Sequence, residues 1–352
     1  MDAVKSRFID CMKCIGIISV VAGHLVDQPF NMYSPYTFHM PLFFFLGGML
    51  YNEGKSFYSL SRSIFNRHFK YIITTYIITG IIGQVIYYKY GIFLGNIFNS
   101  NPISTVYYAL QGNMHTNLLF LTAWFLLAYC LVSLIFGIVI NLSNKINKKH
   151  GPTIVLSLTL IFCIYASSLI LDYITKSFTQ YLNVLMQVLF GGVFFILGYI
   201  FRNKIVLLMN HFLFMLSFLL LLYLVNTGNV QPFTMAWSKY PTGVLMQSLG
   251  AVLCIHGLAF ISYALAKSNL IGPLFLYIGR NSRSIMSYHI CVFVFLDIAF
   301  FKLGLFDIKY ATIENHFINS KTWTLYFFFG VIIPILFRYL FEISKPISNF
   351  NR

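Results

Sequence analysis

Ten apolar stretches follow one another along the chain, each close to the ~20 residues that an α-helix needs to cross a bilayer. Only 9% of the residues are charged while 58% are hydrophobic, and the mean hydropathy is +0.76. So few charges could not solvate a soluble domain of 352 residues, so that class is excluded. The sequence therefore predicts an all-α integral membrane protein with about ten transmembrane helices. The predicted spans are Phe8–Val26, Tyr36–Tyr51, Tyr71–Tyr88, Leu118–Ile140, Thr153–Leu171, Leu182–Phe201, Ile205–Val225, Gly243–Ala266, Ser284–Phe301 and Trp323–Leu340.

Basic residues fall mainly on one side of these predicted spans. With the N-terminus inside, all but six of the 24 Lys and Arg residues lie in or beside cytoplasmic segments. This asymmetry follows the positive-inside rule and predicts that both termini are cytoplasmic. It also accounts for most of the net charge of +15, so the basic excess indicates topology and no nucleic-acid partner is expected. Residues 1–352 are expected to form a single transmembrane domain without an appended soluble domain.

The first apolar stretch carries ionisable residues at both ends. Arg7, Asp10 and Lys13 lie near its start, and His24 lies near its end. Eleven residues turn an α-helix through about three turns plus 20°, so Lys13 and His24 share one face, roughly 16 Å apart. Ionisable groups inside a membrane segment usually face a polar interior and indicate function. For Asp10 and Lys13 a structural alternative remains, because residues three apart on a helix can simply form an ion pair.

Two further groups lie beside this face. His39 is in the first turn of the second span, at about the membrane depth of His24, so the two histidines can meet. The basic loop that follows carries Arg62, Arg67 and Lys70. These cations either anchor the chain at the interface or clamp the phosphates of a cytoplasmic polyanion.

Trp124 and His289 stand near the starts of two later spans. Trp124 is either an anchor in the outer aromatic belt or part of a site, and His289 is either a buried core histidine or a pathway residue. All six cysteines fall within predicted spans. Without a second cysteine pair or histidines at ligand spacing, no metal site is predicted.

Five segments, in this order, resemble the membrane-bound acyltransferase 3 family. They are FIDCMKCIGIISVVAGHL, FHMPLFFFLGG, RHFK, AWFL and IGRNSRSIMSYH. The first contains an acid, a basic residue three positions later and, after ten intervening residues, a histidine, here Asp10, Lys13 and His24. Lys13 and Lys70 stand where that family more often has arginine. The order of the segments is closest to the branch that includes sugar O-acetyltransferases.

The resemblance implies a membrane O-acyltransferase of the cell envelope, multi-pass in a plasma membrane of the bacterial inner-membrane type. The expected acyl donor is cytoplasmic acetyl-CoA, with Arg67, Lys70 and Arg62 on its phosphates. The expected acceptor is a hydroxyl group of a surface polysaccharide, such as O-antigen or capsule, or of a lipid-linked oligosaccharide precursor.

Among the candidate catalytic residues, the resemblance favours His24 as the base, since a neutral imidazole has a pKa near the working pH. His39 would orient the acceptor, share the proton or donate a hydrogen bond to the oxyanion. Asp10 and Lys13 are the other two candidate catalytic residues. The alternative function is a transporter or flippase of a lipid-linked sugar. Such a protein would bind the sugar in a cavity lined by these same residues but would transfer no acyl group. Further candidates for the site are Trp124, His289 and Arg7.

Overall fold

Helices form most of the chain that the computed structural model describes, which comprises residues 3–25, 34–146, 150–269, 271–312 and 315–343. Each of the ten predicted spans overlaps a helix. Val26 and the two ends of the chain, which were predicted to be cytoplasmic, lie outside the described residues. The longer helices are α1 (Ala3–Gly23), α2 (Pro35–Met49), α4 (Lys70–Tyr90), α6 (Ala123–Ser143), α7 (Gly151–Lys176), α8 (Gln180–Phe201), α10 (His211–Asn226), α11 (Gly243–Lys267), α13 (Ser282–Lys302) and α14 (Trp323–Ile343). The shorter ones are α3 (Phe57–Ile64), α5 (Pro102–Gln111), α9 (Ile205–Leu208), α12 (Gly272–Arg280), a π-helical turn η1 (Phe65–Phe69) and the 3-10 turns η2 (Leu118–Phe120), η3 (Met235–Trp237) and η4 (Ile308–Tyr310).

Six helices of the described chain are long and apolar enough to cross a membrane. One is the continuous helix Phe57–Tyr90, made of α3, η1 and α4, and the others are α6, α7, α8, α11 and α13. His211–Asn226 and Trp323–Tyr339 are apolar but shorter. These six helices fit a membrane protein, while the full number of spans stays a prediction.

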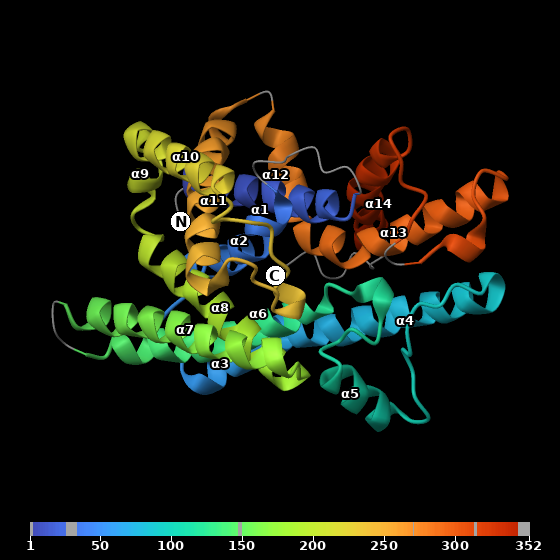
Figure 1. The fold of residues 1–352 in the computed structure, drawn as a ribbon, viewed down its shortest axis with the longest axis horizontal. Coiled ribbons are helices and arrows are strands. Elements are labelled where there is room, and N and C mark those ends of the chain that lie inside the picture. Colours follow the sequence, from blue (N-terminus) through green and yellow to red (C-terminus); the bar gives the residue numbers. More distant parts are fainter. Residues whose placement is uncertain (1–2, 26–33, 147–149, 270, 313–314, 344–352) are drawn as a thin grey trace.

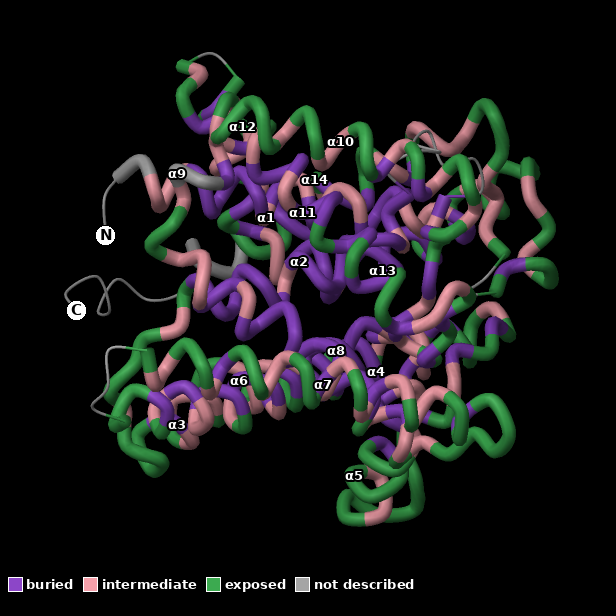
Figure 2. Tube along the Cα trace, turned by 60° about the vertical axis from the view of Figure 1, so that its left-hand side comes forward, coloured by how far each residue is buried: buried purple, intermediate pink, exposed green. Residues whose placement is uncertain are grey.

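Helices α1 and α2 lie in the middle of the molecule and are largely buried (Figure 2). On one side of them lie α3, α4, α6, α7 and α8, and on the other lie α10 to α14 (Figure 1). Helix α1 contacts α2, α11, α12 and α13, while the most extensive contact of α2 is with α8. The ionisable residues of α1 are therefore surrounded by other helices.

Two glycines allow α2 and α8 to cross closely. A Cβ atom on Gly48 would lie 1.8 Å from the carbonyl oxygen of Phe195, and one on Gly198 would lie 1.9 Å from that of Phe45. Any side chain at either position would clash with the opposite backbone, so the crossing requires glycine on both helices. This contact fixes α2 and therefore the position of His39 beside α1.

The predicted span Ile205–Val225 is two helices, α9 and α10, instead of one. The side-chain oxygen of Asn210 accepts a hydrogen bond from the backbone N–H of Leu213 at 3.1 Å and so caps the start of α10. Asparagine is a favoured residue at this position because it satisfies an N–H group that has no partner within the helix. Hydropathy alone does not register such a cap, and the prediction of a continuous helix was wrong here.

Candidate active site

A cavity of about 120 Å³, which we name the histidine pocket, lies where the end of α1, helix α2, the start of α6 and the η3 segment meet. His24, His39 and Trp124 line it, together with Tyr36 and Trp237. The structure thus brings together three of the residues that the sequence singled out. Trp237, in the segment before α11, was not among them.

His289 of α13 lies next to His24, with the centres of the two rings 5.1 Å apart. Its Nδ1 atom lies 2.9 Å from the carbonyl oxygen of Ile285 and 3.0 Å from that of Met286. Carbonyl oxygens only accept hydrogen bonds, so the ring carries its proton on Nδ1 and its Nε2 atom has a free lone pair. This Nε2 atom is buried and has no hydrogen-bond partner in the described structure. Such an atom in a native protein points to a functional role, because an unpaired buried acceptor costs free energy.

His39 has the same tautomer for the same reason. Its Nδ1 atom hydrogen-bonds the carbonyl oxygen of Pro35, the first residue of α2. The ring meets Tyr36 edge-on, with the two ring centres 5.2 Å apart. His39 therefore presents an unprotonated Nε2 atom, which a ligand hydroxyl group could approach.

A buried carboxylate belongs to the same end of the molecule. Asp297 of α13 is 0% exposed. One of its oxygens lies 2.6 Å from Nδ1 of His316, and the other accepts from the Tyr326 hydroxyl at 2.6 Å and from the backbone N–H of Phe317 at 3.0 Å. Three donors thus hold this carboxylate in place.

The Asp297 cluster is linked to the histidines through the ring of Phe293. The centre of this ring lies 5.9 Å from that of His289 and 5.4 Å from that of His316. Neither Asp297 nor His316 was among the site residues predicted from the sequence. An acidic residue within a predicted span was the available signal for Asp297. Nothing in the spacing indicated that a histidine 19 residues later would bind it.

A second cavity, of about 150 Å³, lies beside the middle of α1, at Lys13, and is named the lysine pocket. Lys13, His68 and Arg283 line it, with Tyr129 and other apolar side chains. Arg283 donates from Nη2 to Nδ1 of His68 at 2.9 Å and from Nη1 to the carbonyl oxygen of Arg67 at 3.0 Å. Because His68 accepts at Nδ1 its ring is neutral, and the positive charge of this cavity comes from Lys13 on α1 and Arg283 on α13.

The three predicted phosphate-binding cations lie outside both cavities. Arg62, Arg67 and Lys70 are exposed, on α3, η1 and the first turn of α4. His68 and Arg283, which belong to the RHFK and IGRNSRSIMSYH segments, were not among the site residues predicted from the sequence. The rotation of a helix against its neighbours decides which residues of such a segment point inward. A short sequence segment does not reveal that rotation.

Asp10 is 7% exposed and holds two cations. It accepts from Lys13 Nζ at 3.2 Å and from Arg280 Nε at 3.0 Å. Arg280 reaches it because α12 crosses α1 closely, and a Cβ atom on Gly279 would lie 1.9 Å from the carbonyl oxygen of Asp10. The ion pair that the sequence offered as a structural alternative is therefore present. Arg7 donates to the carbonyl oxygen of Ser268 at 3.3 Å and ties the start of α1 to the end of α11.

Lys13 and His24 both face α2 and α6, but they line different cavities. On α6, Trp124 lines the histidine pocket and the next residue, Phe125, lines the lysine pocket. On α1, the apolar residue Val20 lines the histidine pocket between the two ends. The face of α1 therefore has two polar ends that are separated by an apolar section.

Comparison with known proteins adds one finding. A family model described as an acyltransferase domain matches residues 6–342, a range that includes every residue lining the two pockets. Comparison with curated proteins and with solved structures gave no match.

Proposed function

Because the chain belongs to the acyltransferase 3 family, whose model covers residues 6–342, we propose that it transfers an acetyl group from acetyl-CoA to a hydroxyl group of a cell-surface glycan or of its lipid-linked precursor. The family and the six apolar helices make it a membrane acyltransferase. The observation that supports acetyl transfer to a glycan hydroxyl group is the histidine pocket. There His24 lines a cavity and stands next to a buried histidine that has a free lone pair.

The acceptor hydroxyl group would bind in the histidine pocket. His24 takes the hydroxyl proton while the sugar oxygen attacks the carbonyl carbon of the acetyl group. The carbon–sulfur bond of the thioester then breaks, and the departing sulfur takes up the proton that His24 received. The products are the acetyl ester and CoA as a free thiol, and His24 is again neutral.

His289 supports this step by holding the His24 ring. With ring centres 5.1 Å apart, a rotation of the neutral His24 ring would let its single N–H group donate to Nε2 of His289. The other nitrogen of His24 then faces the pocket as an unprotonated base. In serine hydrolases a carboxylate orients the catalytic histidine in this way, and here a second imidazole takes that part.

The donor would approach from the lysine pocket. Lys13 and Arg283 offer positive charge there, and Arg67 and Lys70 lie exposed nearby, where phosphate groups can reach them. The acyl end of the donor would extend past the apolar section beside Val20 to meet the acceptor. Donor and acceptor would thus bind about three helical turns apart along α1, at Lys13 and at His24.

The test uses the full-length protein in proteoliposomes with radiolabelled acetyl-CoA and a surface-glycan acceptor. Changing His24→Gln should lower incorporation of label into the glycan by about 10²–10⁴-fold, the usual contribution of a general base. The control His150→Gln, at an exposed residue before α7, should stay within about twofold of the unaltered protein. Equal incorporation with His24→Gln would remove His24 from the mechanism. If the glycan crosses the membrane without gaining label, the protein is a transporter instead.

A further inference from the structure

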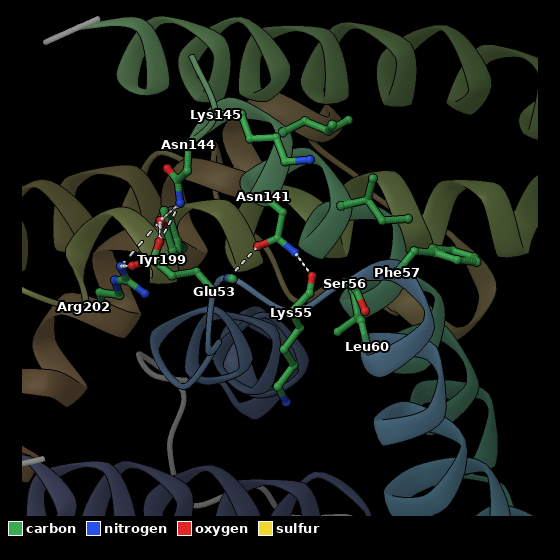
Figure 3. A pocket seen from close by; sticks show the side chains of 13 residues that line it. Glu53, Lys55, Ser56, Phe57, Leu60, Asn141, Asn144, Lys145, Tyr199 and Arg202 are labelled. Carbon is green, nitrogen blue, oxygen red and sulfur yellow. Dashed lines mark hydrogen bonds and ion pairs between the residues drawn. The ribbon is translucent and has the colours of Figure 1, made fainter. Parts of the chain in front are cut away.

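Several polar side chains around the largest cavity, of about 820 Å³, already bind one another or the backbone (Figure 3). This cavity is lined by the connection between α2 and α3, the C-terminal end of α6 and the end of α8. Asn141 accepts a hydrogen bond from the backbone N–H of Gly54 at 3.2 Å. Glu53 binds Arg202 at 2.7 Å and accepts a hydrogen bond from the Tyr199 hydroxyl. These side chains therefore hold the α2–α3 connection against α6 and α8. The histidine pocket differs, because one of its aromatic side chains is open to a ligand.

Trp237 is that aromatic side chain, and it lies at the mouth of the histidine pocket. It lines the cavity and is 40% exposed, whereas Trp124 and Phe233, which also line the cavity, are 5% and 3% exposed. A side chain that lines a cavity and also reaches the surface lies where a ligand enters. An entering ligand therefore meets the indole ring of Trp237.

His115 supports the indole ring of Trp237 from one side. The two rings are stacked, with their centres 4.3 Å apart and their planes 19° apart. His115 itself is not among the residues that line the cavity. A ligand in the cavity can therefore meet only the other face of the indole ring or its edge.

Two buried amide side chains of α8 hold the backbone segments that carry the stacked rings. Asn183 and Gln187 are 0% exposed, and each donates a hydrogen bond to the carbonyl oxygen of Ala236, next to the tryptophan, at 2.9 Å. The side-chain oxygen of Gln187 accepts a hydrogen bond from Asn113, in the turn that carries the stacked histidine, at 3.1 Å. A buried hydrogen-bond network of this kind makes its surroundings rigid. The stacked pair is therefore formed in advance of any ligand, which lowers the free-energy cost of binding.

Both rings come from connections that the positive-inside rule predicts to lie outside the membrane. His115 belongs to residues 91–117 and Trp237 to residues 227–242. A cell-surface glycan would approach from this side, whereas acetyl-CoA is cytoplasmic. The predicted topology therefore favours the acceptor as the ligand that meets Trp237.

The charge of the histidine pocket also favours the acceptor over the donor. Among the described residues that line this cavity there is no lysine and no arginine. The phosphate groups of CoA would find no cation there, while a neutral sugar needs none. The pocket is therefore suited to an uncharged ligand.

A pyranose ring has the chemistry that this arrangement would recognise. The C–H groups on one face of the ring carry a small positive partial charge and are attracted to the negative face of an indole ring. The hydroxyl groups project from the edge of the sugar. His24 and His39 line the same cavity, of about 120 Å³, so a ligand as small as one sugar ring can meet these imidazoles as well as Trp237.

We propose that Trp237 selects the acceptor by stacking on one face of an uncharged pyranose ring, whose hydroxyl edge then faces His24 and His39. This inference rests on the proposed function, because it takes the acceptor to be a glycan. It adds a specificity-determining residue that binds the acceptor and makes no contribution to binding of the donor.

The experiment measures binding of sugars to the full-length protein in detergent, without acetyl-CoA. The probes are the methyl pyranosides of glucose, galactose, mannose and N-acetylglucosamine, and saturation-transfer NMR gives both the dissociation constant and the ring protons that lie against the protein. The glycoside that binds best should bind Trp237→Leu about tenfold more weakly, because leucine has no aromatic face. Trp237→Phe keeps an aromatic ring and should bind within about threefold of the unaltered protein. If none of the four glycosides binds the unaltered protein, the proposal is overturned.

Tyr181→Leu is the matched control. Tyr181 is a 73% exposed aromatic residue at the start of α8, two residues before Asn183, and it does not line the pocket. This variant should bind the glycoside within about twofold of the unaltered protein. Equal weakening by Trp237→Leu and Tyr181→Leu would show that Trp237 is only an aromatic anchor at the membrane interface.

Label transfer separates this inference from the proposed function. Trp237→Leu should raise the KM for the glycan acceptor by about tenfold and leave the KM for acetyl-CoA within about twofold. A similar rise in both KM values would contradict a role in acceptor selection and indicate a general structural role. If Trp237→Leu weakens glycoside binding but even the unaltered protein transfers no label, the sugar site stands and acetyl transfer is wrong.

Discussion

Two sections of the first span, around Asp10 and Lys13 (the lysine end) and around His24 (the histidine end), use their ionisable side chains in opposite ways. At the lysine pocket the polar groups are paired, since Asp10 holds Lys13 and Arg280, and Arg283 binds His68. Beside the histidine pocket, Nε2 of His289 is buried and has no partner among the residues that the structure describes. Pairing lowers the cost of burial and so serves folding, whereas an unpaired buried acceptor lowers stability unless something completes its network. The difference fits the proposal, in which the lysine end serves structure and donor binding and the histidine end serves acyl transfer.

The largest expected effect that tests this contrast is at His289. Changing His289→Leu removes the Nε2 acceptor, so His24 loses its orienting partner and kcat should fall by about 10²-fold, while KM changes little. In His289→Gln the amide oxygen can still accept a hydrogen bond, and kcat should recover to within about tenfold of the unaltered enzyme. Steady-state kinetics of label transfer measure both variants.

A second readout at His289 does not depend on acyl transfer. Diethyl pyrocarbonate modifies unprotonated imidazole nitrogens, and mass spectrometry follows its rate at His24. The rate should change in His289→Leu and return towards normal in His289→Gln. Equal rates in all three proteins would mean that His289 serves packing alone, whatever the activity shows.

From the sequence, the residues that share one helix face could be predicted better than the contacts that these residues make with other helices. The spacing of Lys13 and His24 on a helix was enough to place them on one face, because helical geometry is local. The pairing of Asp297 with His316 arises from contact between α13 and the segment before α14, and the pairing of Arg283 with His68 joins residues 215 positions apart. Such contacts depend on how whole helices are turned and packed, which hydropathy does not specify.

At the lysine end, Asp10→Asn should act mainly on stability. Asparagine cannot neutralise Lys13 and Arg280, and the free energy of unfolding should fall by about 1–3 kcal/mol, less than for a fully buried pair because Arg280 is 63% exposed. Thermal unfolding in detergent measures the change, with the exposed Asp172→Asn as a control that should stay within about 0.5 kcal/mol. A loss of kcat as large as that of His24→Gln, with unchanged stability, would contradict the structural role of Asp10.

The KM for acetyl-CoA should show whether Arg67, which was predicted from the sequence, or Arg283, which the structure places in the lysine pocket, contributes more to donor binding. Arg283 lines the lysine pocket, whereas the side chain of Arg67 is exposed. Arg283→Gln should raise the KM for acetyl-CoA by about tenfold, as expected for one lost charge-assisted hydrogen bond, and Arg67→Gln by about threefold or less. The KM of the acceptor should hardly change in either variant. A larger effect for Arg67→Gln would place the phosphates at the surface, outside the cavity.

The smallest expected effect concerns mild acid at the histidine end. His115 stacks on Trp237, which lines the histidine pocket, with ring centres 4.3 Å apart, and burial lowers the pKa of His115 to about 4. Between pH 6.5 and 4 the unfolded chain therefore binds a proton at His115 that the folded chain does not, so this residue costs stability as the pH falls, by about 1–2 kcal/mol at pH 5. His115→Phe keeps a ring on Trp237 but cannot titrate. On going from pH 7 to pH 5, the unaltered protein should thus lose about 1–2 kcal/mol more free energy of unfolding than His115→Phe. Equal losses in the two proteins would show that protonation of His115 does not lower stability.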